Sequence, residues 1–197
     1  MRDLDVAAER LERRLGLGSY AGGKHPGWGT GNRIVPLGGA YVELLAVVDA
    51  EEARSHPFGR TFADSIADGD RLSGWCLAVE DLESVAARLG LPIRRGARLL
   101  PGGDTLRWSM VGREEAMAEP FLPFFIRWEV SEDRHPGRVP VRHRAEPTGI
   151  AWVEVSGERR RLAEWLGGAD APVRAVEGPA AVRAAGIATS HGELILR

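Results

Sequence analysis

The sequence predicts an α+β fold made of two related units, each with one helix and several strands, followed by a shorter third unit. The main observation is an internal repeat. DLDVAAERLERRLGL at the amino terminus and DLESVAARLGL at residues 81–91 share an acidic start, Val-Ala-Ala and Leu-Gly-Leu. The two copies lie roughly 77 residues apart, and strand-like segments follow each of them. This pattern indicates two modules of common design.

Each copy of the repeat is expected to form a helix with one apolar face. Residues 3–15 can be capped by Asp3 or Asp5, and Gly16 and Gly18 end the segment. The apolar positions recur at helical spacing in both copies: Leu4, Ala8, Leu11 and Leu15 in the first, and Leu82, Val85, Ala86 and Leu89 in the second.

Residues 25–48 hold the strands of the first unit. They read as a glycine-rich crossing, a strand at 33–37, a tight Gly38-Gly39 turn and a strand at 41–48. The second of these strands is almost wholly apolar except for Glu43. An ionised carboxylate inside a buried strand costs several kcal/mol unless it is paired or ligates a partner. Glu43 is therefore expected to be either a pocket residue or half of a structural ion pair.

The rest of the chain supplies a second unit and a third. A polar connection at 50–70 holds a short helix, and the second unit has strands at 72–79, 98–100, 105–111 and 121–130. A Pro/Arg/His-rich linker follows at 132–147. The third unit is expected to be of βαβ type, with these elements: a strand at 150–155, a helix at 158–166, a strand at 173–176, a helical turn opening at Pro179 and a hairpin of 187–189 with 194–196. We therefore divide the chain into a paired-module domain, residues 1–131, and a carboxyl-terminal α+β unit, residues 148–197, packed on it.

The first unit lacks the strand that precedes the helix in its twin. RLSGWCLAVE stands before the second helix, whereas only Met1 and Arg2 stand before the first. Either the true start lies upstream of Met1 or another chain completes the sheet, and we favour the upstream start. Without that strand, the neighbouring edge is exposed and open to pairing with a second copy.

Composition and charge argue against several classes of protein. The formal charge of −2 gives no broad basic field for nucleic acid or anionic lipid. Cys76 is the single cysteine, so an intrachain disulfide cannot form, and its apolar neighbours indicate a packed thiol. The amino terminus has no apolar signal core, and no run reaches the roughly 18 apolar residues of a membrane span. We expect a cytoplasmic protein without nucleic-acid or membrane partners.

The ordered set of motifs resembles a known family. The duplicated βαβββ pattern resembles the vicinal oxygen chelate superfamily, which includes glyoxalases, bleomycin-resistance proteins and dioxygenases. The glyoxalase-like branch of that superfamily is similar in these segments: His25-Pro26 through Gly29-Thr30-Gly31-Asn32, Tyr41-Val42-Glu43-Leu44, Pro123-Phe124-Phe125-Ile126 with Trp128, and His135-Pro136. The resemblance covers most of residues 1–197. It implies that the two modules enclose a cleft, with the first module lacking its initial strand.

The resemblance also implies a metal centre, but the matching residues are mostly missing. Family enzymes hold a divalent ion with a His on the first strand of each module and a Glu on the last. Here the first His would precede Met1, Gly74 takes the place of the second His, and Ile126, or Arg127 in a shifted register, takes the place of the second Glu. Only Glu43 matches, and such ions need several converging donors. We expect no cofactor; a divalent metal is the alternative if Glu43 is a ligand.

Glu43 and His25 are the candidate catalytic residues. Glu43 is expected to act as a general base or ligand-binding carboxylate whose pKa burial raises. The competing interpretation is a structural salt bridge with Arg127, which interrupts an equally apolar strand in the second unit. His25 lies next to the strand that carries Glu43, so it is expected at the rim of the cleft as an acid/base group. The alternative for His25 is a loop histidine that packs locally.

Five further residues are candidates for ligand binding. Thr30 and Asn32 supply polar groups, Trp75 and Trp108 supply aromatic walls, and Arg127 supplies a cation. For any single Trp, core filling is the favoured interpretation. The glycines at 27, 29 and 31 are not a dinucleotide motif, because they lead into a strand rather than a helix.

Two functions fit these features. The first is a glyoxalase-like protein that acts on a small organic molecule without the usual metal, as a lyase or isomerase relative in which Glu43 transfers a proton. The second is a non-catalytic protein that binds a small molecule, resembling resistance proteins that sequester a drug. The first uses the carboxylate that remains, and the second accounts for the missing metal ligands. A homodimer is the expected assembly if the first module's edge pairs.

Overall fold

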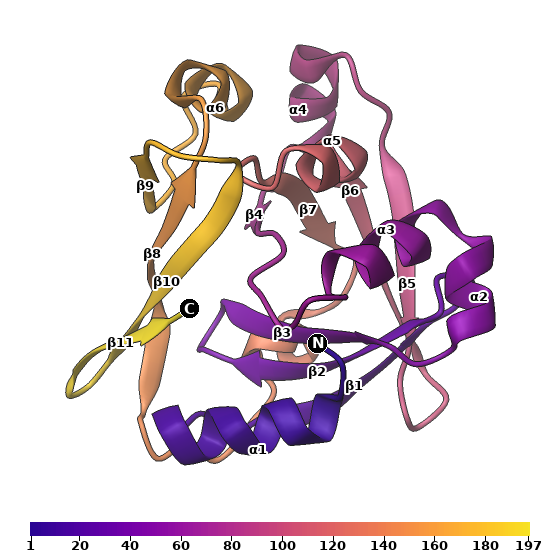
Figure 1. Ribbon diagram of the computed structural model, residues 1–197, viewed down its shortest axis with the longest axis vertical. Helices are drawn as coiled ribbons and strands as arrows, with labels where there is room; N and C mark the ends of the chain where they lie inside the picture. Colours follow the sequence, from indigo (N-terminus) through magenta and orange to yellow (C-terminus); the bar gives the residue numbers. More distant parts are fainter.

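Two β-sheets and six α-helices make up the structure, a computed structural model that describes residues 1–197 (Figure 1). The larger sheet has seven strands in the order β3-β2-β1-β5-β6-β7-β4 and curls into a half-barrel. The smaller sheet has the order β11-β10-β8-β9. The fold is thus α+β, as the sequence predicts.

The seven-stranded sheet combines two modules of the predicted design. The first contains α1 (Leu4–Leu15), β1 (Tyr20–His25), β2 (Thr30–Pro36) and β3 (Tyr41–Val47), and the second contains β4 (Cys76–Ala78), α4 (Leu82–Leu89), β5 (Arg94–Leu99), β6 (Thr105–Val111) and β7 (Phe124–Trp128). The modules meet where β1 and β5 pair antiparallel at Lys24 and Leu99. Helices α2 (Ala50–Ser55), α3 (Pro57–Ser65) and α5 (Arg113–Ala118) lie in the connections.

The helices of the repeat begin and end on local signals. Asp3 caps α1, because its carboxylate accepts hydrogen bonds from the backbone N–H groups of Asp5 and Val6. Gly16 ends α1 in the left-handed conformation, with φ of 68°. Asp81 and Gly90 have the same roles in α4, so both halves of the repeat form the expected helix.

The outer edge of β3 has no strand beside it, whereas in the second module β4 runs parallel to the matching strand β7. The N–H of Val79, just after β4, donates to the carbonyl of Ile126 at 3.0 Å. The amino group of Met1 donates to the carbonyl of Leu45 at 2.7 Å. If these two hydrogen bonds are equivalent in the two modules, Leu45 of β3 corresponds to Ile126 of β7. Glu43, two residues before Leu45, then corresponds to Phe124 rather than to the expected Ile126 or Arg127.

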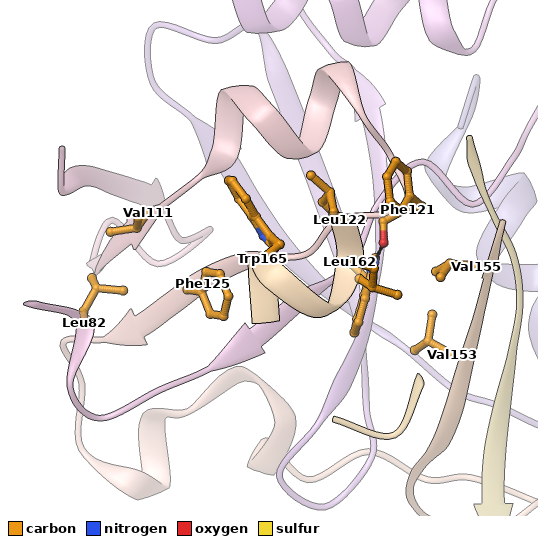
Figure 2. Packing of buried hydrophobic residues seen from close by; sticks show 10 residues of the cluster. Leu82, Val111, Phe121, Leu122, Phe125, Val153, Val155, Leu162 and Trp165 are labelled. Atoms are coloured by element: carbon orange, nitrogen blue, oxygen red, sulfur yellow. Dashed lines mark hydrogen bonds between the residues drawn. The ribbon is translucent and has the colours of Figure 1, made fainter. Parts of the chain in front are cut away.

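The smaller sheet packs against the half-barrel through a shared core. It consists of β8 (Pro147–Ser156), α6 (Arg159–Leu166), β9 (Val173–Val176), β10 (Ala181–Thr189) and β11 (Gly192–Leu196), with β8 and β9 parallel as in the predicted βαβ unit. Figure 2 shows the rings of Phe121, Phe125 and Trp165 gathered in one cluster with aliphatic side chains from both sheets. The indole N–H of Trp165 donates to the carbonyl of Pro123 at 2.7 Å, which fixes α6 against the segment before β7.

Several elements differ from the sequence prediction. Residues 20–25 form β1, a strand that was not predicted; β2 and β5 supply its hydrogen-bonding partners on both sides. The expected helical turn after Pro179 is wrong: this segment is β10, which pairs with β8 along its whole length. Helix α5 was not predicted, and β4 is only three residues long.

Candidate functional site

A cluster of polar side chains lies on the concave face of the half-barrel. His25 ends β1, Asn32 lies in β2, Glu43 in β3, Arg98 in β5 and Trp108 in β6, and all five line one cavity. Their side chains meet because alternate residues of neighbouring strands point to the same face of a sheet. His25 is directly opposite Thr30 in the β1–β2 ladder, and Asn32 and Glu43 are diagonal neighbours in β2 and β3.

The Asn32 amide joins the two candidate catalytic residues. Its Nδ2 donates a short hydrogen bond to Oε1 of Glu43 and lies 3.4 Å from Nε2 of His25. The other ring nitrogen of His25, Nδ1, is 3.0 Å from Oγ1 of Thr30. In this arrangement Nε2 accepts and Nδ1 carries the proton. The Nε2 lone pair therefore faces Oε1 of Glu43, at 3.7 Å.

His25 is held neutral by its surroundings. Its side chain is buried, and this burial lowers the pKa from 6.5 to about 4. The nearby charge of Glu43 acts in the opposite direction, whereas the guanidinium groups of Arg98 and Arg113 lower the pKa further. Near neutral pH, His25 is thus an uncharged imidazole.

Glu43 is less buried than the sequence indicates. Its side chain is 38% exposed, because β3 is an edge strand and its carboxylate faces an open groove. The expected ion pair with Arg127 does not form. Arg127 instead binds Glu83 of α4 with two hydrogen bonds of 2.6 and 2.9 Å. Arg127 does not line the cavity, so its predicted placement beside the ligand is wrong as well.

Aromatic rings form the other walls of the cavity. Trp108 and Trp128 are 5.1 Å apart between ring centroids, and His25 stacks on Trp28 at 5.5 Å. Trp108 fits there because Gly96, opposite it in β5, has no side chain: a Cβ would lie 2.3 Å from the indole. Trp75 belongs to the shared core, where its N–H donates to the carbonyl of Phe121.

Sequence reasoning missed three polar residues of the cavity as candidates: Tyr41, Arg98 and Arg113. Arg113 opens α5, and its guanidinium lies over the rings of Phe58 at 4.4 Å and Phe124 at 4.8 Å. Arg98 could have been selected as a charged residue on the inward face of a strand. Which residues of β5 face inward depends on how this strand pairs with its neighbours, and the local sequence does not show it.

A groove of about 960 Å³ runs from the cavity between the open edge of β3 and strand β4. Glu43 and Arg113 border both spaces, so the groove gives access to the polar cluster. Apolar residues form most of its walls, including residues of the smaller sheet such as Val153 and Ala185. Cys76 also lines it, and burial together with the charge of Glu43 raises the pKa of its thiol to about 12. Cys76 is therefore protonated and is not a nucleophile.

The donors at this site do not fit a divalent metal centre. One imidazole and one carboxylate converge, from His25 and Glu43, and the third group between them is the donating amide of Asn32. No group of three or more His, Cys, Asp or Glu side chains in the structure is arranged to hold a metal ion. Borderline and hard cations need more converging donors than these two.

Comparison with known families identifies the relationship. A family model described as a glyoxalase-like domain matches residues 1–169, which is most of the chain. The chain belongs to this family. The match includes both modules of the half-barrel and extends through α6 of the smaller sheet. None of the curated proteins matches this glyoxalase-like chain.

Solved structures share the fold of this glyoxalase-like protein. One is the crystal structure of a hypothetical protein from Staphylococcus aureus, with a TM-score of 0.59 and 18% sequence identity. The alignment covers 94% of this chain and 80% of that one, so both sheets belong to the common fold. None of the helices in the present structure has the length and apolar character needed to cross a membrane.

Proposed function

We propose that this glyoxalase-like protein binds a small organic molecule in the groove and transfers a proton to or from it without a metal, as a lyase or isomerase relative. The observation that carries the proposal is the carboxylate of Glu43, which accepts a hydrogen bond from Asn32, lies 3.7 Å from Nε2 of His25 and borders an accessible groove. Asn32 donates to Glu43 and contacts His25, so it fixes both groups.

The arrangement supports proton abstraction next to a carbonyl group. Glu43 reaches the groove, so its carboxylate takes the proton from a bound molecule. His25 is neutral and buried, and it contacts the Asn32 amide that holds this carboxylate, so it acts as a positioning residue. The aromatic wall of Trp108 and Trp128 suits an unsaturated or flat molecule.

The substitution Glu43→Gln tests this proposal, because it keeps the shape of the side chain and removes the base. Exchange of carbon-bound hydrogen for deuterium in small hydroxy ketones and aldehydes would be followed by NMR. We expect Glu43→Gln to lower the exchange rate by about 10²- to 10⁴-fold, while affinity for the same compound changes little. Glu51→Gln, on the exposed start of α2, is the matched control and should exchange at the wild-type rate.

A second function, binding without turnover, is supported by the donor set. One imidazole and one carboxylate are too few for a metal centre, whereas the cavity and its aromatic walls would serve a binding protein unchanged. Tight binding of a compound that shows no exchange, with equal affinity in the wild type and Glu43→Gln, would establish the binding protein and refute catalysis by Glu43. A cytoplasmic location and a homodimer remain predictions.

A further inference from the structure

Arg98 is a buried cation that pairs with no carboxylate, and its hydrogen-bond partner is the neutral hydroxyl of Tyr20. Its side chain is only 2% exposed, and neither Nε nor Nη2 has a hydrogen-bond acceptor. Oδ1 of Asn32 lies in the same cavity and is likewise buried without a donor. Buried guanidinium groups normally bind a carboxylate or several carbonyl groups, because a guanidinium buried without acceptors loses its hydration energy and gains nothing in return.

The backbone is shaped to admit this side chain. In β5, Gly96 and Arg98 are buried and face the cavity, while the residues between and beside them are more exposed. Gly22 is the bulged residue of β1, and a Cβ there would lie 2.1 Å from Oδ1 of Asn32 and 3.1 Å from Nη1 of Arg98. A Cβ on Gly23 would lie 2.0 Å from the carbonyl of Leu99. Glycine at 22 and 23 therefore leaves space for the guanidinium.

The charges around the cavity leave an excess of positive charge. Arg98 and Arg113 both line it, and Glu43 is the only acidic residue that does. Glu43 accepts a hydrogen bond from Asn32. Tyr20 does not balance the charge of Arg98 either, because burial raises the pKa of its hydroxyl and keeps it neutral, although the charge of Arg98 and its hydrogen bond with Tyr20 act against that rise. The cavity therefore has one positive charge without a counter-ion.

The space beside Arg98 fits an anionic group of few atoms. The cavity holds about 40 Å³, which is room for about three water molecules and so for the three heavy atoms of a carboxylate. It joins the larger groove at Glu43 and Arg113. A molecule with its anionic end in the cavity would thus leave its body in the groove and pass Glu43 on the way.

We propose that Arg98 binds the carboxylate of the ligand, so that the molecules recognised by this protein are small organic acids. This rests on the proposed small-molecule pocket and names its chemical class. The guanidinium supplies two adjacent N–H donors, Nε and Nη2, which match the two oxygens of a carboxylate. In the ligand-free protein, Arg98 is a buried charge without compensation and lowers the stability of the fold. In the complex, the carboxylate of the ligand compensates this charge, so Arg98 stabilises the complex at the expense of the free protein.

Benzoate and benzamide provide the test, since they have nearly the same shape and differ in charge. Binding of each to the full chain at neutral pH would be measured by calorimetry or ligand-observed NMR. We expect the wild type to bind benzoate about ten- to hundred-fold more tightly than benzamide, the worth of a charge-assisted hydrogen-bond pair. Arg98→Met should abolish this preference and raise the melting temperature of the ligand-free protein.

The control is Arg95→Met, which alters an exposed arginine of the same strand and should keep the preference. Equal binding of the two probes by the wild type would overturn the proposal for Arg98 and leave the small-molecule pocket standing. Binding of neither probe would overturn both. The wild-type comparison needs no variant, so a failure of Arg98→Met to fold does not weaken it.

Discussion

Burial of His25 as a neutral ring makes the stability of the fold depend on pH. The ring titrates with a pKa of about 4 in the folded protein, against 6.5 for an ordinary histidine. The unfolded chain therefore binds a proton that the folded protein rejects at every pH between these two values. It follows that the free energy of unfolding falls as pH decreases through this interval.

The size of this effect follows from the shift. One pKa unit corresponds to 1.36 kcal/mol, so the full difference between pH above 6.5 and pH below 4 is about 3 kcal/mol. At pH 5 the protein should already have lost about 2 kcal/mol through this residue. The groups that set the value face His25 from three strands and one helix: Thr30, Glu43, Arg98 and Arg113.

Urea unfolding of the wild type and His25→Gln, followed by tryptophan fluorescence near pH 7.5 and pH 5, measures this contribution. The variant cannot titrate at this position, so the wild type should lose about 2 kcal/mol more than the variant over that range. Burial also lowers the pKa values of His135 and His143, but both proteins contain these residues and the difference cancels them. His191→Gln, in the exposed β10–β11 turn, should follow the wild type. Equal losses in His25→Gln and the wild type would refute the assignment of a neutral buried ring.

Two further predictions concern packing. Gly96→Ala puts a Cβ 2.3 Å from the Trp108 indole, so it should displace that ring, lower the free energy of unfolding by about 1–3 kcal/mol and change the near-ultraviolet circular dichroism. The control is Gly102→Ala, whose Cβ meets nothing within 4 Å. An unchanged spectrum for Gly96→Ala would contradict the reasoning. Trp165→Ala should lower the free energy of unfolding in urea by about 3–5 kcal/mol, because this ring belongs to the core shared by the two sheets. Separate unfolding transitions for the two sheets in the wild type would show that this core does not couple them.

The parts of the fold that were predicted correctly depend on local signals. Helices α1 and α4 have acidic caps, apolar faces and terminal glycines within a dozen residues, so their bounds follow from the chain itself. Strand β9 was placed at its observed bounds because it is short, apolar and flanked by turns. By contrast, β1 and β10 are rich in glycine and alanine, and only their pairing with neighbouring strands makes them extended.

The candidate site shows the same division. His25, Thr30, Asn32, Glu43 and Trp108 were selected from the sequence, and the structure brings these five together. Trp75 was selected by the same reasoning and lines the groove as well as the shared core, whereas Arg127 points to α4. Residue type and position along a strand were enough to nominate candidates, whereas the face of the strand had to come from the structure.

Arg98 shows why the function of this site depends on long-range geometry. Its strand has arginines at three positions, and two of them are exposed, so composition gives no reason to single out the third. What distinguishes Arg98 is that Gly22 and Gly23, more than seventy residues earlier, leave room for its guanidinium and its stem, and that no carboxylate pairs with it. The single acid of the cavity accepts a hydrogen bond from Asn32 instead. A site that keeps its carboxylate as a base and its guanidinium without a counter-ion is arranged so that the ligand itself completes the ion pair.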